Sequence, residues 1–245
     1  MAFYNCLLLD ADGTLLDFEA AEHGAIAETL EHFSLPCGED SISKYSEIND
    51  ALWKELELGK ISQNKLTVTR FEKLLAALQV QGNAEEMNLY YRGRLAAHAE
   101  IIPGADELLA ELSEVATLVL VSNGIEQIQM ARLTDSGLIG YFDGIYISGR
   151  VGVAKPNRKI FDIALEQLGV TNRKKVLVVG DSLTSDIKGG NAAELDTCWL
   201  NLTEKENTTG IHPNHTVQSY EELMRIVMEE EELANVGSSE KRHSV

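Results

Sequence analysis

The sequence predicts an α/β protein, with a Rossmann-like, doubly wound parallel sheet as its core and an inserted helical-bundle cap domain. Short apolar runs alternate with segments whose apolar residues recur at helical spacing, and this alternation is typical of a parallel sheet covered by helices on both faces. The first apolar run lies about a hundred residues before the second, whereas a βαβ unit takes about 30 residues. A further segment is therefore inserted between the first two strands.

The apolar runs are expected to be buried strands, because they are too apolar for one face to lie in water. In chain order they are residues 6–9, 116–121, 144–147, 175–179 and 196–200. Helical spacing between these runs predicts helices at residues 105–112, 125–136, 156–168 and 185–193. Pro156 suits the first turn of its helix, where a missing N–H leaves no hydrogen bond unmade.

The inserted segment, residues 17–100, shows no strand pattern and is expected to form the helical cap. Its apolar spacing predicts helices at about 19–33, 41–58, 60–78 and 84–99. Because the insertion follows the first strand directly, the cap would lie over the carboxyl ends of the strands. Residues 1–16 and 101–232 would form the core, and a last helix at 221–232 would fray into a flexible C-terminal tail at 233–245.

The composition is that of an ordinary globular protein, with 44% hydrophobic residues and three cysteines in no disulfide or zinc-site pattern. With 39 acidic and 21 basic residues the net charge is −18, which argues against nucleic acid or an anionic membrane as a partner. The N-terminus lacks the pattern of a signal peptide, and no apolar run approaches the roughly 18 residues of a membrane helix. The expected location is therefore cytoplasmic.

Residues that carry chemistry follow several of the predicted strands. Asp10 and Asp12 close the first strand, and residues two apart point the same way, so both carboxylates would leave the strand end together. Two negative charges so near each other are unfavourable unless they share a cation or a proton. The other sets are Ser122-Asn123-Gly124 after the second strand, Lys155 before Pro156, and Asp181 with Asp186 after the fourth strand.

Each set alone is typical of a turn or a helix cap. Ligands of open parallel sheets bind outside the carboxyl ends of the strands, however, so the four sets are expected to meet at one place. Together they indicate a phosphoryl-transfer site. Because the protein is strongly acidic, such a site must supply its own positive charge through a cation, a lysine or backbone N–H groups.

In this order the four sets resemble the motifs of the haloacid dehalogenase superfamily of phosphohydrolases, and the insertion resembles that superfamily's helical cap of the first type. Residues 151–162 (VGVAKPNRKIFD) and 197–201 (TCWLN) look like a bacterial house-cleaning subgroup of pyrimidine 5′-nucleotidases. The resemblance implies a phosphoric monoester hydrolase that acts on nucleoside 5′-monophosphates. A small phosphorylated metabolite is thus the expected partner, and no protein partner is predicted.

The resemblance also implies a role for each catalytic residue. Asp10 would attack phosphorus and form an aspartyl-phosphate, which divides one difficult displacement into two easier ones. Asp12 would protonate the leaving alkoxide and then take a proton from the hydrolytic water. Lys155 would supply positive charge at the phosphoryl group.

Further residues are implied as binding groups for the phosphate and for a metal. The phosphoryl oxygens would be held by Ser122 and the backbone N–H groups of Asn123 and Gly124, together with Lys155. The implied cofactor is Mg²⁺, with Mn²⁺ or another divalent cation as alternatives, because carboxylate and carbonyl oxygens suit hard cations. Its implied ligands are Asp10, the backbone carbonyl of Asp12, Asp181 and Asp186, the last acting through water or by orienting its loop.

Several alternatives remain open at this level. A sugar-phosphate phosphatase or a phosphomutase of the same superfamily would use the same motifs, and His23 in the first cap helix would be available to assist a mutase. A phospho-receiver signalling module also combines acidic residues with a Ser or Thr and a Lys, but it lacks a large helical insertion. Dehalogenation is disfavoured because the dehalogenases of this superfamily lack an acid at the position that Asp12 occupies. Four aromatic residues of the cap are candidates to stack on a base, and none is assigned: Tyr45, Trp53, Tyr90 and Tyr91.

Overall fold

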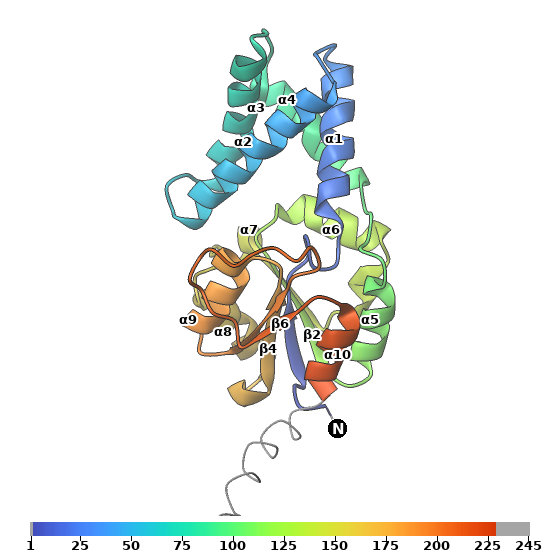
Figure 1. The fold of residues 1–245 in the computed structure, drawn as a ribbon, viewed down its shortest axis with the longest axis vertical. Helices are drawn as coiled ribbons and strands as arrows, with labels where there is room; N and C mark the ends of the chain where they lie inside the picture. The colour runs from blue at the N-terminus through green and yellow to red at the C-terminus, as the bar shows by residue number, and fades with distance from the viewer. Residues whose placement is uncertain (1, 229–245) are drawn as a thin grey trace, which may run out of the picture.

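A six-stranded parallel sheet forms the core of the protein (Figure 1). The structure is a computed structural model and describes residues 2–228. The strands lie in the order β3-β2-β1-β4-β5-β6, which confirms the predicted fold class. Their bounds are β1 (Cys6–Leu9), β2 (Thr117–Ser122), β3 (Gly144–Ile147), β4 (Val176–Gly180), β5 (Asp196–Leu200) and β6 (His215–Val217).

The first five strands agree with the predicted runs to within one residue. Strand β6 was not predicted, because its three residues include only one that is buried, Val217. It lies at the sheet edge, where it pairs with β5. So short a segment offers no apolar run for a sequence pattern to reveal.

Both faces of the sheet are buried, as the apolar runs predict. Leu7 and Leu9 of β1 face a cluster formed with α5 (Ala105–Ser113) and α10 (Tyr220–Met228). Cys6 and Leu8 face the opposite cluster, formed with α8 (Lys159–Gln167). Alternate residues of a strand point to opposite faces, so helices on both sides of the sheet bury the whole strand.

The remaining core helices are α6 (Glu126–Asp135), α7 (Ser148–Val151) and α9 (Lys188–Ala192), with 3₁₀ turns at Leu138–Tyr141 and Arg173–Lys175. The predicted helix 185–193 begins instead with a π-helical segment, Leu183–Ile187. The predicted end of the last helix at residue 232 and the predicted tail at 233–245 lie outside the described residues. Among residues 2–228, no helix is long and apolar enough to cross a membrane.

Four helices between β1 and β2 form a bundle that stands apart from the sheet (Figure 1). They are α1 (Phe18–His32), α2 (Glu39–Glu57), α3 (Gln63–Leu78) and α4 (Ala84–Ala97), here called the inserted bundle. The bundle has its own core, in which Tyr45, Phe71 and Tyr91 are fully buried.

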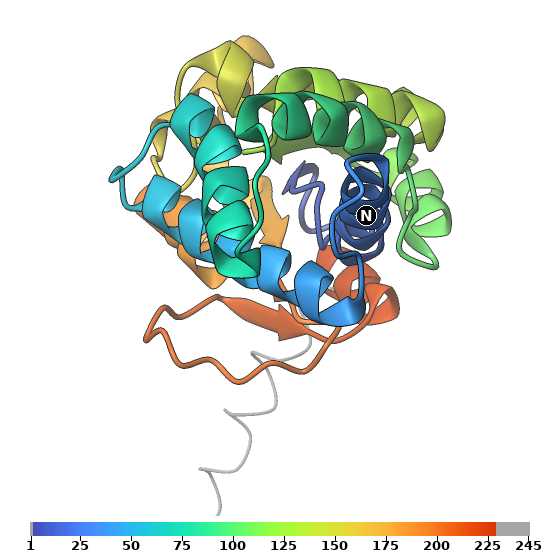
Figure 2. The ribbon, with the colours of Figure 1, turned by 90° about the horizontal axis from the view of Figure 1, so that it is seen from above.

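Two linkers join the inserted bundle to the core, and they run side by side. The N–H of Asp17 donates to the carbonyl of Glu100 at 2.9 Å, and the Asp17 carboxylate caps α1 by accepting from the N–H of Ala20 at 3.0 Å. Viewed from above, the bundle lies over the carboxyl end of the sheet, with α4 alongside α6 (Figure 2). The bundle therefore covers the edge of the sheet at which the predicted motifs occur.

Candidate active site

The register of the central strands brings the predicted site residues together. Strand β1 lies between β2 and β4, and Leu9 is paired with both neighbours. The next residue, Asp10, thus emerges at the middle of the carboxyl edge of the sheet. Ser122 ends β2 on one side, and Asp181 follows β4 on the other. Residues more than a hundred positions apart in the chain meet here because the strands are parallel.

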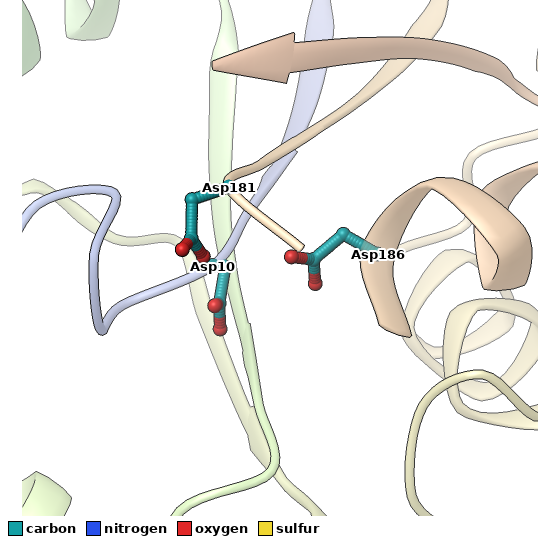
Figure 3. Close-up of side chains that lie close together, drawn as sticks. All are labelled: Asp10, Asp181 and Asp186. Carbon is teal, nitrogen blue, oxygen red and sulfur yellow. The ribbon is translucent and has the colours of Figure 1, made fainter. Parts of the chain in front are cut away.

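Three carboxylates converge at this edge. Asp10, Asp181 and Asp186 each offer an oxygen, and these oxygens all lie within 4.8 Å of one another (Figure 3). Burial raises the pKa of Asp10 well above its usual range, and the nearby carboxylates add to the rise while Lys155 opposes it. Burial, followed by the charge of Asp186, raises the pKa of Asp181 to about 7. The cluster therefore holds more negative charge than a buried site favours.

Lys155 supplies the positive charge within this cluster. Its side chain is 2% exposed, and its Nζ lies 2.6 Å from Asp10 Oδ1, 2.7 Å from Asp186 Oδ1 and 2.6 Å from the carbonyl oxygen of Val121. Burial opposes the charge of the ammonium, but the Asp10 and Asp186 carboxylates outweigh it and raise the pKa of Lys155 above its ordinary value. One ammonium thus faces three carboxylates.

The donor set fits a hard divalent cation. It consists of oxygen atoms alone, and Mg²⁺ prefers oxygen ligands at about 2.1 Å, which places ligands about 3.0 to 4.2 Å from one another. The oxygens of Asp10 and Asp181 need only a small adjustment to meet this spacing. Asp186 is engaged on both oxygens, one with Lys155 and the other with the N–H of Ser182 at 3.1 Å. Asp186 therefore orients Lys155 and its own loop.

A glycine allows the two acidic loops to approach. Gly13 has a φ of +75°, which L side chains rarely adopt. A Cβ at this position would lie 2.7 Å from Oδ2 of Asp181. The backbone after Asp12 can therefore pass close to Asp181 only if residue 13 has no side chain.

The segment after β2 forms hydrogen bonds that the sequence did not indicate. The Ser122 hydroxyl accepts from the N–H of Gly124 at 3.0 Å and from Gln129 Nε2 at 3.0 Å. The Asn123 side chain accepts from the N–H of Lys155 and donates to its carbonyl, each at 2.8 Å. Asn123 thus fixes the backbone of Lys155, a role beyond the predicted use of its own N–H.

Asp12 is held by two residues of α6 that the sequence reasoning missed. Gln129 Nε2 donates to Asp12 Oδ2 at 2.8 Å, and Arg132 Nη1 forms an ion pair with Asp12 Oδ1. Both side chains are buried. The available signal was their position, since they share the buried face of α6 with Ile128 and Leu133. Polar residues on an otherwise apolar helical face indicate a partner inside the protein.

A cavity of about 430 Å³ lies above these residues and is lined by both the core and the inserted bundle. Phe18, Trp53 and Leu95 of the bundle face it, together with Ile125 and Ile128 of the core. This volume is in the usual range for small-ligand sites. The bundle also contributes four charged residues to the lining, Asp50, Lys54, Glu57 and Arg70, so the cavity offers both apolar and charged contacts above the acidic cluster.

The four aromatic residues considered from sequence have different positions. Trp53 lines the cavity. Tyr45 and Tyr91 are fully buried within the inserted bundle, and Tyr90 stacks on the His32 ring with centroids 3.9 Å apart. His23 has a half-exposed side chain, pairs with Glu39 at 3.3 Å and does not line the cavity.

Hydrogen bonds join the bundle to the core beside the cavity. Thr184 Oγ1 donates to Glu57 Oε2 at 2.8 Å, and Gln63 Nε2 donates to the carbonyl of Asn123 at 3.1 Å. Both core partners belong to segments that carry predicted site residues, Asn123 in the loop after β2 and Thr184 in the π-helical segment that contains Asp186. The position of the bundle is therefore linked to the geometry of these segments.

Comparison with known proteins agrees with this arrangement. Residues 4–194 match the family model of the haloacid dehalogenase-like hydrolases. The chain is 37% identical to the HAD-hydrolase YfnB of Bacillus subtilis over 93% of this chain and 97% of that protein. A crystal structure of YfnB bound to magnesium superposes with a TM-score of 0.87, over 91% of this chain and 98% of that one.

Two further relatives carry a more specific name. Pyrimidine 5′-nucleotidase PynA of Streptococcus pneumoniae is 38% identical over 91% of this chain and 94% of its own length. Pyrimidine 5′-nucleotidase YjjG of Escherichia coli is 37% identical over 91% of this chain and 98% of its own length. From the family match and these near full-length similarities, the chain belongs to the haloacid dehalogenase-like hydrolases.

Proposed function

We propose that this protein is a Mg²⁺-dependent phosphomonoesterase that acts through an aspartyl-phosphate, with pyrimidine nucleoside 5′-monophosphates as its substrates. The observation that carries the proposal is the convergence of Asp10, Asp181, Asp186 and Lys155 at the base of a cavity that the inserted bundle covers with both aromatic and charged side chains. In this proposal, residues 17–100 act as a cap over a core of residues 1–16 and 101–232.

Asp10 is the nucleophile. Lys155 holds its Oδ1 at 2.6 Å, which leaves Oδ2 to attack phosphorus. The ammonium also neutralises part of the charge that brings a carboxylate and a phosphate dianion into contact. The bond from phosphorus to the leaving oxygen breaks as the bond from phosphorus to Asp10 forms.

Asp12 serves both half-reactions. Its carboxyl gives a proton to the departing alkoxide, and the resulting carboxylate takes a proton from the water that hydrolyses the aspartyl-phosphate. Its side chain is 26% exposed, so it is open to the cavity where the leaving group and the water would lie.

The metal and the phosphate share the same base of the cavity. Asp10 and Asp181, with the backbone carbonyl of Asp12, would hold the cation, and Asp186 would support the site through Lys155. When bound, Mg²⁺ offsets the negative charge of the carboxylates and polarises the phosphoryl group. Ser122 and the N–H of Asn123 would receive the phosphoryl oxygens, and the N–H of Gly124 would join them by giving up its bond to the Ser122 hydroxyl.

Two observations support a nucleotide as the substrate. Relatives that align over nearly their whole length are named pyrimidine 5′-nucleotidases. The cavity presents Trp53 and Phe18 beside aliphatic side chains, and a flat aromatic base gains free energy by packing on such a wall. The cytoplasmic location expected from the sequence stays a prediction.

A substrate panel tests the proposal. Initial rates of phosphate release in Mg²⁺ are measured for uridine, thymidine, cytidine and purine monophosphates and for hexose phosphates. We expect the pyrimidine nucleotides to be the fastest. Slow nucleotides beside a fast hexose phosphate would make the protein a sugar-phosphate phosphatase, and isomerisation of a hexose phosphate without release of phosphate would make it a mutase.

Two variants separate catalysis from folding. Asp10→Asn is expected to abolish phosphate release from every substrate. Asp106→Asn is the matched control, because Asp106 of α5 forms an exposed hydrogen bond with the Tyr141 hydroxyl and does not line the cavity. Full activity of Asp10→Asn would overturn the mechanism, and a stable phosphorylated protein without repeated turnover would favour a phospho-receiver.

A further inference from the structure

A buried arginine connects α6 to the loop after β1. Arg132 is completely inaccessible to solvent. Its Nη1 forms the ion pair with Asp12, and its Nε donates to the carbonyl of His98 at 2.8 Å. Its Nη2 has no hydrogen-bond partner among the described residues. An incompletely paired guanidinium is costly to bury, so a contribution to stability is a poor explanation for its presence.

Gln129 complements this contact from the same face of α6. Its Nε2 lies 2.8 Å from Asp12 Oδ2 and 3.0 Å from the Ser122 hydroxyl. Its Oε1 accepts from Arg132 Nη1 at 3.4 Å. Residues three apart on a helix are neighbours, so the two side chains reach Asp12 together. A Cβ on Gly124 would lie 2.5 Å from Gln129 Cγ, so glycine at position 124 leaves room for this side chain.

The two donors hold different oxygens of one carboxylate. Arg132 holds Oδ1 and Gln129 holds Oδ2, so the carboxylate of Asp12 cannot rotate without losing one of them. Each carboxylate oxygen has two lone pairs, and each therefore keeps one for proton transfer. The Asp12 side chain is 26% exposed and faces the cavity, whereas the Arg132 side chain is fully covered.

We propose that Arg132 and Gln129 are positioning residues, which hold the Asp12 carboxylate in the orientation it needs to deliver and accept a proton. The inference rests on the proposed phosphomonoesterase function, because it assigns the acid and base role to Asp12. In this proposal neither residue binds the phosphoryl group directly, although Gln129 also donates to the Ser122 hydroxyl. They act on the leaving group and on the hydrolytic water through Asp12.

The contact with His98 adds a link to the inserted bundle. His98 follows α4, in the linker that returns from the bundle to the core. The same guanidinium thus contacts the acid of the site and the backbone of this linker. Arg132 therefore fixes the position of the Asp12 carboxylate relative to the inserted bundle, which would cover the substrate.

Leaving-group dependence distinguishes positioning from a general structural role. A nucleoside leaves as an alkoxide and needs a proton, whereas p-nitrophenolate leaves without one. kcat/KM reports only the steps up to departure of the leaving group. We therefore expect Arg132→Gln to lower kcat/KM for uridine monophosphate by about 10², within the usual contribution of general acid catalysis. The same variant should lower kcat/KM for p-nitrophenyl phosphate by less than about tenfold.

The second half-reaction gives an independent readout. Hydrolysis of the aspartyl-phosphate needs Asp12 as a base whatever the first substrate was. With p-nitrophenyl phosphate, Arg132→Gln should consequently show a burst of p-nitrophenol that approaches one equivalent per active site. Slow steady-state turnover should follow the burst.

Three further variants complete the design. Arg132→Lys keeps the charge and should recover part of the loss with uridine monophosphate, while Gln129→Leu should show the same leaving-group dependence if Arg132→Gln does not fold. Arg173→Gln is the matched control: Arg173 also joins a carboxylate, Asp162, to a carbonyl, that of Ala193, but at the opposite end of the sheet. Its activity should equal that of the unsubstituted protein.

The outcomes are distinct. Equal losses on both substrates, without a burst, would overturn the positioning role while leaving the phosphatase function intact. An unsubstituted protein that hydrolyses neither substrate would instead contradict the proposed function itself. Melting temperatures of all variants, measured in the same buffer, show which of them are folded.

Discussion

Replacement of Lys155 by methionine tests the charge arrangement at the base of the cavity. The change removes an ammonium that is 2% exposed and lies 2.6 and 2.7 Å from Asp10 and Asp186. Loss of one partner from a buried ion pair costs about 3–5 kcal/mol, because the other charge is left unpaired. For a protein of this size, each kcal/mol lowers the melting temperature by about 2–4 °C. We therefore expect a decrease of about 6–20 °C in metal-free protein, together with loss of activity.

The loss of stability caused by Lys155→Met should depend on pH in a definite direction. Burial already raises the pKa of Asp10, and Lys155 opposes that rise. Without the ammonium the pKa of Asp10 rises further. A carboxyl whose pKa is higher in the folded than in the unfolded state lowers the free energy of unfolding as the pH increases. The deficit of Lys155→Met should thus be larger at about pH 8 than at about pH 5.

Thermal unfolding monitored by circular dichroism, with a chelator present, measures the effect. Lys159→Met is the control, because Lys159 is an exposed lysine four residues further along the chain. A double variant, Lys155→Met with Asp186→Asn, should recover part of the lost stability since it removes one of the unpaired charges. If Lys155→Met melted within about 1 °C of the unsubstituted protein at every pH, the ion-pair reasoning would be refuted.

Three other predictions concern the metal, the loop and the substrate. Because the pKa of Asp181 is raised to about 7, protons compete with Mg²⁺ for this carboxylate below that pH, and the rise in melting temperature caused by Mg²⁺ should be larger at about pH 8 than at about pH 6. Equal rises at the two pH values would contradict the assignment of Asp181 as a metal ligand. Gly13→Ala should lower the free energy of unfolding in a urea titration by about 1–3 kcal/mol, because residue 13 has a φ of +75°. It should also weaken Mg²⁺ binding, since the new Cβ would lie 2.7 Å from Asp181 Oδ2, and an unchanged Mg²⁺ affinity would argue against Asp181 as a ligand. Trp53→Ala should raise KM for uridine monophosphate about tenfold, as expected for a lost stacking contact of about 1.4 kcal/mol, and should leave KM for glycerol phosphate unchanged. Equal changes in the two KM values would exclude a base-stacking role for Trp53.

The fold was predictable from the sequence because it depends on long-range patterns of burial. Five strands lie within one residue of the predicted runs, and each is buried on both faces. The four helices of the inserted bundle lie within three residues of their predicted bounds, since breaks such as Gly59 separate clear helical patterns. Strand β6 was missed because edge pairing rather than composition defines it.

The candidate site was predictable only in part. The motif residues Asp10, Ser122, Lys155 and Asp181 follow strands or precede a helix, so topology alone brings them to one edge. The contacts of Arg132 with Asp12 cross from one element to another and have no sequence spacing of their own. For the same reason the sequence offered four candidate aromatic residues for the substrate, whereas the structure places only Trp53 of these at the cavity.

The central claim is that Asp10 carries the phosphoryl group during turnover. The most direct measurement is an acid quench of the protein during hydrolysis of uridine monophosphate with Mg²⁺, followed by digestion and mass spectrometry of the peptide that contains residues 6–16. We predict one added phosphate on Asp10, which is absent from Asp10→Asn and disappears once the substrate is exhausted. Phosphate on another residue, or continued turnover by Asp10→Asn, would contradict the claim.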